Sequence, residues 1–331
     1  MTDKLNQGHA QHTVLLWVVG FGVVLVWVML GMAFGPSAVL FGVLVSAIAL
    51  ALIVRRYRFG LRTFLLAVAV LGVWLGLKSS QDVRMDQALT TIENNGGQLK
   101  VYDRKPNFPW GLWKYRYHLD FFGLEEPLSA QIFPHLKVLA PSSLHSLDLS
   151  NTGVTDKDLE FVEGPTDLEI LLLSNETYAN GEVIPDRPQN KITDAGLARL
   201  GNLRSLKGID LSGTEVTDDG LKILSQMPNL IWVYLDGTNV TGPGIAYLKS
   251  HNDLHMLELN GCKLTPNAYE NVIQLPILSS LGLRNSGTSD TDLQLLEENT
   301  SLGILRLGDT NVSEEAVHQF ELTHPNCKIE R

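Results

Sequence analysis

The sequence predicts an α/β solenoid preceded by transmembrane helices. Two observations predict the solenoid: a leucine pattern returns at steps of 24 residues through residues 144–331, and each unit joins an alternating apolar stretch to a helical pattern. One observation predicts the helices, namely three long uncharged apolar runs within residues 1–78. The two parts of the chain are therefore expected to have different surroundings, lipid for the first and water for the second.

Residues 1–78 are predicted to form a membrane anchor with helices near 14–34, 37–54 and 59–77. The first run has 21 uncharged residues and the second has 18. At about 1.5 Å per residue, helices of this length approach or exceed a hydrocarbon core of roughly 30 Å. No ionisable residue lies inside the apolar runs, which argues against a transporter or a proton relay. The predicted partner of this region is the lipid bilayer itself.

The third run, Thr63 to Leu77, has two interpretations. Its 15 residues span only about 22 Å as a helix, which is shorter than the membrane core. The run crosses if the helix begins near Phe59 and if Arg62 and Lys78 extend their side chains to the headgroups. The alternative is an interfacial helix that does not cross.

Four arginines in the short loop between the second and third runs predict the orientation of the anchor. Positively charged loops stay on the cytoplasmic side, which places the N-terminus in the cytoplasm as well. If the third run crosses, everything after Lys78 is extracytoplasmic. We therefore expect an integral protein of the cytoplasmic (inner) membrane with its repeats on the outer side.

Charge is distributed unevenly along the chain. Residues 1–78 hold one acid and six bases, a net charge of +5, and the whole chain carries −10, so residues 79–331 carry −15. An acidic domain repels phosphate backbones, which makes nucleic acid an unsuitable partner. With only two cysteines, the chain has neither a disulfide framework nor a cysteine metal cluster.

Residues 79–143 fit neither pattern. Ser79 to Asn95 predicts an amphipathic helix ended by Gly96-Gly97, and a strand is expected near residues 99–102. Six aromatic residues follow between Trp110 and Phe122. Because a solenoid needs its first core layer covered, this stretch is predicted to be a linker and an N-terminal capping unit. An aromatic belt resting on the membrane is the other interpretation.

Seven repeats occupy residues 144–331, with a truncated unit at the C-terminal end. The fourth position of each unit is aliphatic and the sixth is always leucine, an alternation typical of a strand with one buried face. The twelfth position is always Thr or Ser, which suits a helix N-cap, and an acid commonly follows it. Their first residues are Leu144, Leu168, Leu206, Leu230, Leu254, Leu278 and Leu302.

The full repeat, LxxLxLxxTxVTDxGLxxL, is complete from Leu206 to Leu224, with Ile209 at the fourth position. It resembles the repeat of bacterial leucine-rich-repeat proteins, and the arrangement of the chain is similar to members that carry an N-terminal multi-helix membrane anchor. The resemblance implies a horseshoe-shaped solenoid, with parallel strands on the concave face and helices on the convex face. It also implies a role in protein recognition and no catalytic residues.

The third, fifth and seventh positions of each unit are expected to point outward from the strands. Across units three to seven these positions bring aromatic, methionine and charged side chains together, a composition typical of a contact surface. Shielding of apolar groups by their neighbours is the alternative explanation. The candidate partner-binding residues are Trp232, Tyr234, Met256, Glu258, Asp210, Asp236, Arg284 and Arg306.

The step from Leu168 to Leu206 is 38 residues, so one unit carries 14 extra residues. This insertion is predicted at about residues 176–190, as a loop that is either functional or idle. No catalytic motif, nucleotide-binding loop or metal-ligand spacing is found, so the sequence predicts no enzyme, no cofactor and no metal. We expect a protein- or peptide-binding or scaffold module. The alternative is a structural protein of the bacterial envelope that self-associates.

Overall fold

The computed structural model describes residues 83–107, 111–121, 127–128, 130–139, 144–162, 167–175 and 188–331. The three predicted membrane spans and residues 176–187 of the predicted insertion lie outside these ranges. Among the described residues, no helix is both long enough and apolar enough to cross a membrane.

Short strands alternate with short helices along the described chain. Residues 83–94 are helical. The strands are β1 (Gln98–Asn107), β2 (Gly111–Asp120), β3 (Leu144–Asp148), β4 (Ile170–Leu172), β5 (Gly208–Asp210), β6 (Trp232–Tyr234), β7 (Met256–Glu258), β8 (Ser280–Gly282), β9 (Ile304–Arg306) and β10 (Lys328–Glu330). The α-helices are α4 (Phe133–Leu139), α5 (Asp194–Arg199), α6 (Leu221–Leu224), α7 (Pro266–Val272), α8 (Asp290–Leu296) and α9 (Glu314–Thr323). The 3₁₀ helices are η1 (Ala130–Ile132), η2 (Asp158–Val162) and η3 (Pro243–Ser250).

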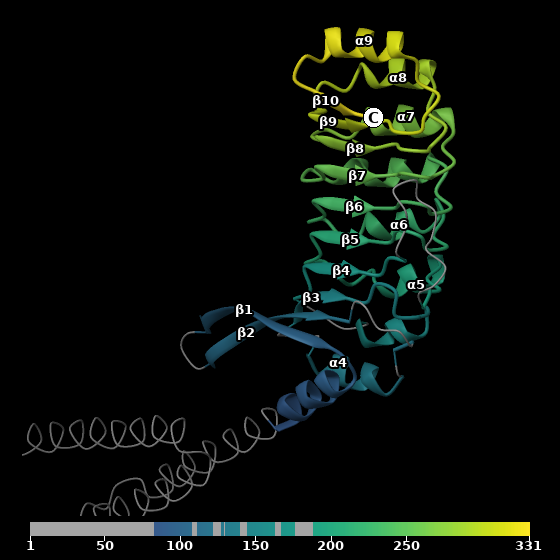
Figure 1. Ribbon diagram of the computed structural model, residues 1–331. Coiled ribbons are helices and arrows are strands. Elements are labelled where there is room, and N and C mark those ends of the chain that lie inside the picture. The colour runs from purple at the N-terminus through teal and green to yellow at the C-terminus, as the bar shows by residue number, and fades with distance from the viewer. Residues whose placement is uncertain are drawn as a thin grey trace, which may run out of the picture. The chain divides into compact units, whose positions relative to one another are not determined.

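One ten-stranded sheet joins all the strands in chain order. β1 and β2 pair antiparallel, whereas every pair from β2 to β10 is parallel. Equivalent positions of successive repeats face one another, so that Trp232 pairs with Gly208 on one side and with Met256 on the other. The stacked strands line one side of the repeat domain and the helices line the opposite side (Figure 1). The predicted parallel-strand repeat fold is confirmed.

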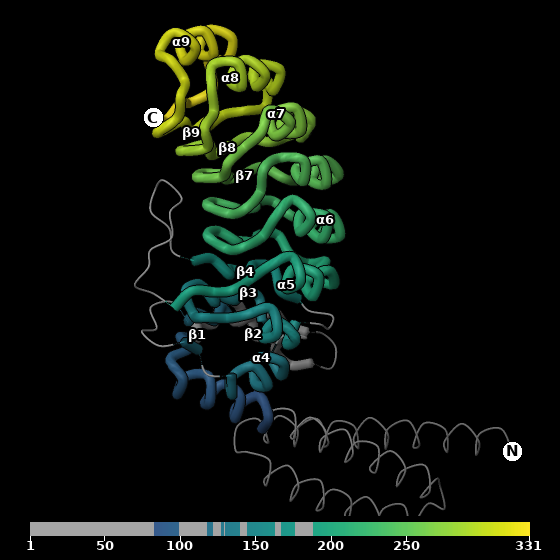
Figure 2. Tube along the Cα trace, turned by 90° about the vertical axis from the view of Figure 1, so that its right-hand side faces the viewer, coloured from purple at the N-terminus to yellow at the C-terminus, as the bar shows by residue number. Residues whose placement is uncertain are grey.

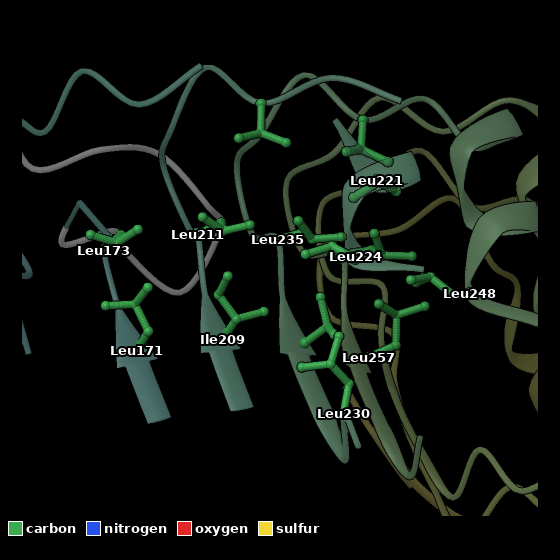
Figure 3. Close-up of a cluster of buried hydrophobic side chains, with 14 of the residues drawn as sticks. Leu171, Leu173, Ile209, Leu211, Leu221, Leu224, Leu230, Leu235, Leu248 and Leu257 are labelled. Atoms are coloured by element: carbon green, nitrogen blue, oxygen red, sulfur yellow. The ribbon is translucent and has the colours of Figure 1, made fainter. Parts of the chain in front are cut away.

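The hydrophobic core lies between the strands and the helices. Its strand side comes from the fourth and sixth positions of each unit, and its helix side from leucines such as Leu221 and Leu224, all fully buried. The same pair of positions recurs from strand to strand as a continuous row (Figure 3). No single unit buries these faces alone, so the core exists only because the units stack. In a view turned by 90° from that of Figure 1, the repeats lie one above another along the solenoid (Figure 2).

The ninth position of each unit closes the turn after the strand. The hydroxyls of Thr152, Thr214 and Thr238 each donate to the carbonyl oxygen of the sixth residue of the same unit, at 2.5–2.7 Å. These side chains are buried, and the bond satisfies a carbonyl that would otherwise face the core. A small hydroxyl side chain therefore suits this position in both volume and hydrogen bonding.

In the second unit this ninth position is filled by Asn190. Its side-chain oxygen accepts from the amides of Thr152 and Val154, and its side-chain nitrogen donates to the carbonyls of Leu149 and Leu173. Asn190 is therefore a repeat residue, and the 14-residue insertion comprises residues 176–189 rather than reaching residue 190. The count of residues alone did not distinguish the two placements.

A ladder of aspartates links successive turns on the helix side. The carboxylates of Asp156, Asp194, Asp218 and Asp290 accept from both the backbone amide and the hydroxyl of the twelfth residue of the next unit. Those partners are Thr193, Thr217, Thr241 and Ser313, at 2.6–3.0 Å. We call these four aspartates and their partners the turn ladder. The sequence pattern places these acids beside the N-cap residue of their own helix and does not reveal this contact, because the partner lies in another repeat.

The helical half of the repeat is not uniform. In the first and fourth units it is the 3₁₀ helices η2 and η3 rather than α-helix. In the fourth unit Gly242 has a positive φ of 129° and Pro243 follows, a combination that supplies no ordinary α-helical first turn. In the first unit Asp158 accepts from both the amide and the hydroxyl of Thr155, which tightens the turn.

Both ends of the repeat core are covered. At the first repeat, Ile92 of the 83–94 helix, Leu119 of β2 and Phe121 are fully buried in the same core as Leu144. At the last repeat, Phe320 of α9 is fully buried and β10 extends the sheet beside β9. The core is thus closed at the first repeat by residues that precede it and at the last repeat by α9 and β10. The division into a capping unit, seven repeats and a truncated unit stays a prediction.

Candidate functional site

The side chains at the third, fifth and seventh positions of the units, on β3–β10 and directly after these strands, form a surface that we call the strand face. Every candidate residue predicted from the sequence lies on it, in the third, fifth or seventh position of its unit. The fifth-position residues Asp210, Tyr234 and Glu258 are direct partners across β5, β6 and β7. The third-position residues Trp232 and Met256 are partners beside them.

The aromatic part of the strand face is built on a glycine. A Cβ atom at Gly208 would overlap the indole ring of Trp232, so the indole rests against the backbone of the preceding strand. The rings of Trp232 and Tyr234 are 4.9 Å apart between centroids, and the phenol hydroxyl donates to the sulfur of Met256 at 3.0 Å. All three side chains are half-buried. They form a preformed apolar platform with part of its surface open to solvent.

Two aspartates border this platform. Asp210 accepts from the amide of Ser212 at 2.9 Å, and Asp236 accepts from the amide of Asn260 at 2.8 Å. Burial raises the pKa of Asp210, and burial together with the charges of Glu258 and Asp210 raises the pKa of Asp236 to about 6. The ionised form of both groups is therefore under-solvated. We call Asp210, Trp232, Tyr234, Asp236 and Met256 the aromatic–acidic patch.

The remaining charged candidates form a separate ion-pair network. One guanidinium nitrogen of Arg306 lies 2.6 Å from Glu258, and another lies 3.2 Å from Glu330. Arg284 is 3.7 Å from the same Glu330 carboxylate, whose pKa is lowered, first by its hydrogen bond with Lys328. We call Glu258, Arg284, Arg306 and Glu330 the C-terminal ion network. Its arginines are occupied within the protein.

The structure thus divides the eight predicted residues into two groups of different character. Glu258 is buried rather than exposed, because Arg306 and Asn260 cover it and because its carboxylate lies over Gly282. An outward position in the alternation does not guarantee exposure when neighbours are this close. Glu330 was missed by the sequence reasoning, although the register of the truncated last strand places it in the same row as Arg306.

No group of His, Cys, Asp or Glu side chains suited to hold a metal ion occurs in the part of the chain that the structure describes. Cys262 is fully buried at a ninth position and donates to the carbonyl of Leu235 at 3.1 Å. Burial raises the pKa of its thiol to about 11, so it stays protonated at neutral pH. These properties are those of a core residue.

Parallel strands, a leucine core and a recurring hydroxyl turn define a fold of the leucine-rich-repeat type. No protein-family model matches the chain, and no curated protein matches it. Solved structures similar to it include a leucine-rich-repeat protein of Leptospira interrogans, at 20% identity and a TM-score of 0.38, covering 62% of this chain and 52% of that one.

Two internalins of Listeria monocytogenes are also similar. One has 16% identity and a TM-score of 0.36, covering 59% of this chain and 62% of that one, so this chain spans less than two thirds of its length. The other, internalin C2, has 19% identity and a TM-score of 0.35, covering 60% of this chain and 82% of that one. These values are too low to add to what the repeat geometry establishes.

Proposed function

We propose that the chain is a non-catalytic, membrane-anchored binding module whose strand face holds a protein or peptide. The observation that carries the proposal is the aromatic–acidic patch. Trp232 and Tyr234 contact each other with tilted rings on the strand face and keep part of their area open to solvent. Large aromatic side chains held rigidly at a surface are the commonest anchors of protein interfaces, since little conformational entropy is lost when they bind.

The proposed location is the outer side of the cytoplasmic membrane, with the three apolar runs of residues 1–78 as the anchor. The uncharged lengths of the runs and the arginine-rich loop support it. A reporter active only outside the cytoplasm, fused after Arg331, is expected to be active, and the repeats are expected to be open to protease in cells with a permeabilised outer layer. A silent and protected reporter would place the repeats in the cytoplasm.

Site-specific photo-crosslinking in living cells tests the binding role. A photoreactive phenylalanine analogue replaces Tyr234 in the patch or, as the matched control, Tyr247, which is exposed on the helix side. We expect a discrete crosslinked product at position 234 that is absent at position 247. Equal patterns at both positions would argue against a binding surface at the patch.

The mass of the crosslinked product separates the two roles that the sequence left open. A crosslinked product that contains this chain and a second, different protein supports a binding module. A product of twice the chain's own mass, with no other protein present, would instead indicate the self-associating structural role.

A further inference from the structure

The charges of the strand face are segregated along the sheet. From β3 to β6 the third, fifth and seventh positions contain three acids, Asp148, Asp210 and Asp236, and no base. The three bases of these positions, Arg284, Arg306 and Lys328, all lie in the C-terminal units. The half of the strand face that carries the aromatic platform is therefore the acidic half.

The nearby bases are already paired. Arg306 is bonded to Glu258 and Glu330 in the C-terminal ion network. Lys207, which adjoins β5 in sequence, forms an ion pair with Glu169 at 2.7 Å. Among the described residues, no Lys or Arg forms an ion pair with either Asp210 or Asp236. The two carboxylates are held by hydrogen bonds alone.

Three carboxylates surround the aromatic platform. Burial raises the pKa of the Tyr234 phenol, and the negative charges of Glu258, Asp210 and Asp236 raise it further, against Arg306 alone in the opposite direction. With Glu258 neutralised by Arg306, the platform has two uncompensated carboxylates beside it. An aromatic face attracts a cation through its quadrupole, and a partly desolvated carboxylate attracts one by charge.

These observations select one kind of occupant for the proposed binding face. We propose that the aromatic–acidic patch binds a lysine or arginine side chain of an extended basic segment in the partner protein. The cationic group lies over Trp232 and Tyr234 and forms ion pairs with Asp210 and Asp236. This inference rests on the proposed function and adds the chemistry of the partner to it.

The cation compensates a cost that the free protein carries. Both aspartates are partly removed from water without a counter-charge, so the free surface is electrostatically unfavourable and a bound cation relieves it. The apolar stem of lysine or arginine also matches the platform, since Met256 contacts its methylene groups while the cationic head lies over the two rings and reaches the carboxylates. An acidic segment would meet only repulsion at this half of the strand face.

The test uses the full chain in non-ionic detergent micelles and an immobilised library of random 12-residue peptides free of histidine. We expect retained peptides to be enriched in Lys and Arg and depleted in Asp and Glu. The affinity of a selected peptide, measured by fluorescence anisotropy, is expected to fall at least tenfold when its basic residue is replaced by norleucine. An equal affinity after that replacement would overturn the inference.

Matched variants assign the effect to the patch. The double variant Asp210→Asn/Asp236→Asn is expected to lose at least tenfold in affinity for the basic peptide. The control Asp253→Asn/Asp309→Asn changes the net charge equally at two exposed sites and is expected to bind like the wild type. Thermal unfolding of each variant verifies that it is folded. Equal losses in both double variants would reveal general charge attraction and overturn the proposed contact.

The pH dependence supplies a second readout. Asp236 has a pKa of about 6 in the free protein, and the titratable groups that act on it are Asp210 and Glu258 on the neighbouring strands and Tyr234 in its own repeat. Its ionised form is the one that pairs with a cation, so affinity is expected to fall about tenfold from pH 7 to pH 5. Affinity unchanged over that range, with Asp236 titrating near 6, would contradict the ion pair.

The variant Trp232→Ala separates the two proposals. If peptides without basic residues are selected and are lost in this variant, the strand face binds peptides but the partner is not basic, and only the inference fails. If no peptide is retained, or if retention is the same in Trp232→Ala, the proposed function fails as well.

Discussion

Asp218, on the turn before α6, and Asp236, just after β6, are carboxylates of adjacent repeats with opposite electrostatic character. Asp218 accepts from the hydroxyl of Thr241 and from the amides of Thr241, Gly242 and Gly244. Although burial acts to raise the pKa of Asp218, these bonds lower it below its usual value. For Asp236 burial dominates, and the pKa rises to about 6.

The two sides of the repeat domain therefore differ in how well their carboxylates are stabilised by the fold. On the helix side each acid of the turn ladder accepts two hydrogen bonds from the next repeat, and the fold stabilises the charge of Asp218. On the strand face Asp210 and Asp236 carry a charge that burial makes unfavourable. Locally unfavourable groups that persist in an otherwise consistent structure commonly mark functional sites.

The largest expected effect on stability comes from Asn190, whose buried side chain is fully hydrogen-bonded within the repeats. The change Asn190→Ala removes the side-chain partner of the buried Leu173 carbonyl and of the buried amides of Thr152 and Val154, and it removes one of the two donors to the Leu149 carbonyl. It is expected to destabilise the repeats by about 4 kcal/mol. Thermal unfolding followed by circular dichroism measures it. Asn311→Ala, at an exposed asparagine, is the control and is expected to be neutral. Equal stability of the two variants would mean that the second turn does not depend on this side chain.

Asp218→Ala is expected to lower the stability by about 3 kcal/mol at pH 7, since it removes charge-assisted bonds to a neighbouring repeat. Because the folded-state pKa is lowered, this contribution is present at neutral pH and is lost as the pH falls to 4 and below. The difference between the variant and the wild type should therefore shrink in acid. The adjacent Asp219→Ala, at an exposed residue, is expected to change little. A pH-independent difference would contradict the role of the charge.

Asp236→Asn is expected to change the stability in the opposite direction, as a gain rather than a loss. The folded-state pKa is raised, so the native protein binds a proton more tightly than the unfolded chain between about pH 4 and 6, and stability falls as the pH rises through that window. Asparagine does not titrate and is expected to be about 1–2 kcal/mol more stable than the wild type at pH 7, after allowance for partial exposure. The gain should vanish below pH 4. Destabilisation at pH 7 would show that the carboxylate is favourable where it lies.

The smallest effect concerns the platform beneath Trp232. In Gly208→Ala the added methyl group overlaps the indole of Trp232, which has to shift away from the strand. Because a half-buried side chain moves rather than the backbone, the stability loss should stay below about 1 kcal/mol. The indole of Trp232 should become more accessible to quenching by acrylamide. Its contribution is obtained by subtracting the fluorescence of the variant Trp232→Phe, which keeps the other five tryptophans. Gly303→Ala, where the nearest atom is 3.6 Å from the added carbon, is the control. Unchanged quenching in Gly208→Ala would mean that the indole does not rest on this glycine.

The repeat period and its register were predictable because the identity of the residue at each position of the unit is enough to show them. A 24-residue step places Trp232 beside Met256, and a two-residue alternation places both on the same face as Tyr234. What the sequence did not reveal was the pairing between charged positions. The bond between Arg306 and Glu258 joins units two steps apart, and whether side chains of that length meet or point apart depends on their conformations rather than on the period.

The same reasoning explains the position of the insertion. Spacing fixed its length, whereas the hydrogen bonds of Asn190 fixed its end. The small residues at the ninth position of other units did not predict an asparagine in the second. Whether residues 1–78 cross a membrane stays a prediction, since those residues lie outside the described ranges.

The two asparagines beside the insertion have a consequence for how the protein tolerates change. The amide of Asn190 donates to the Asn175 side chain at 2.6 Å, and that side chain donates back to the Asn190 carbonyl at 3.0 Å. The two ends of the insertion, at Asn175 and Asn190, are thus joined directly by hydrogen bonds within one repeat. Evolution or an engineer is able to lengthen, shorten or exchange this segment as a cassette, while the remainder of the solenoid keeps its pitch.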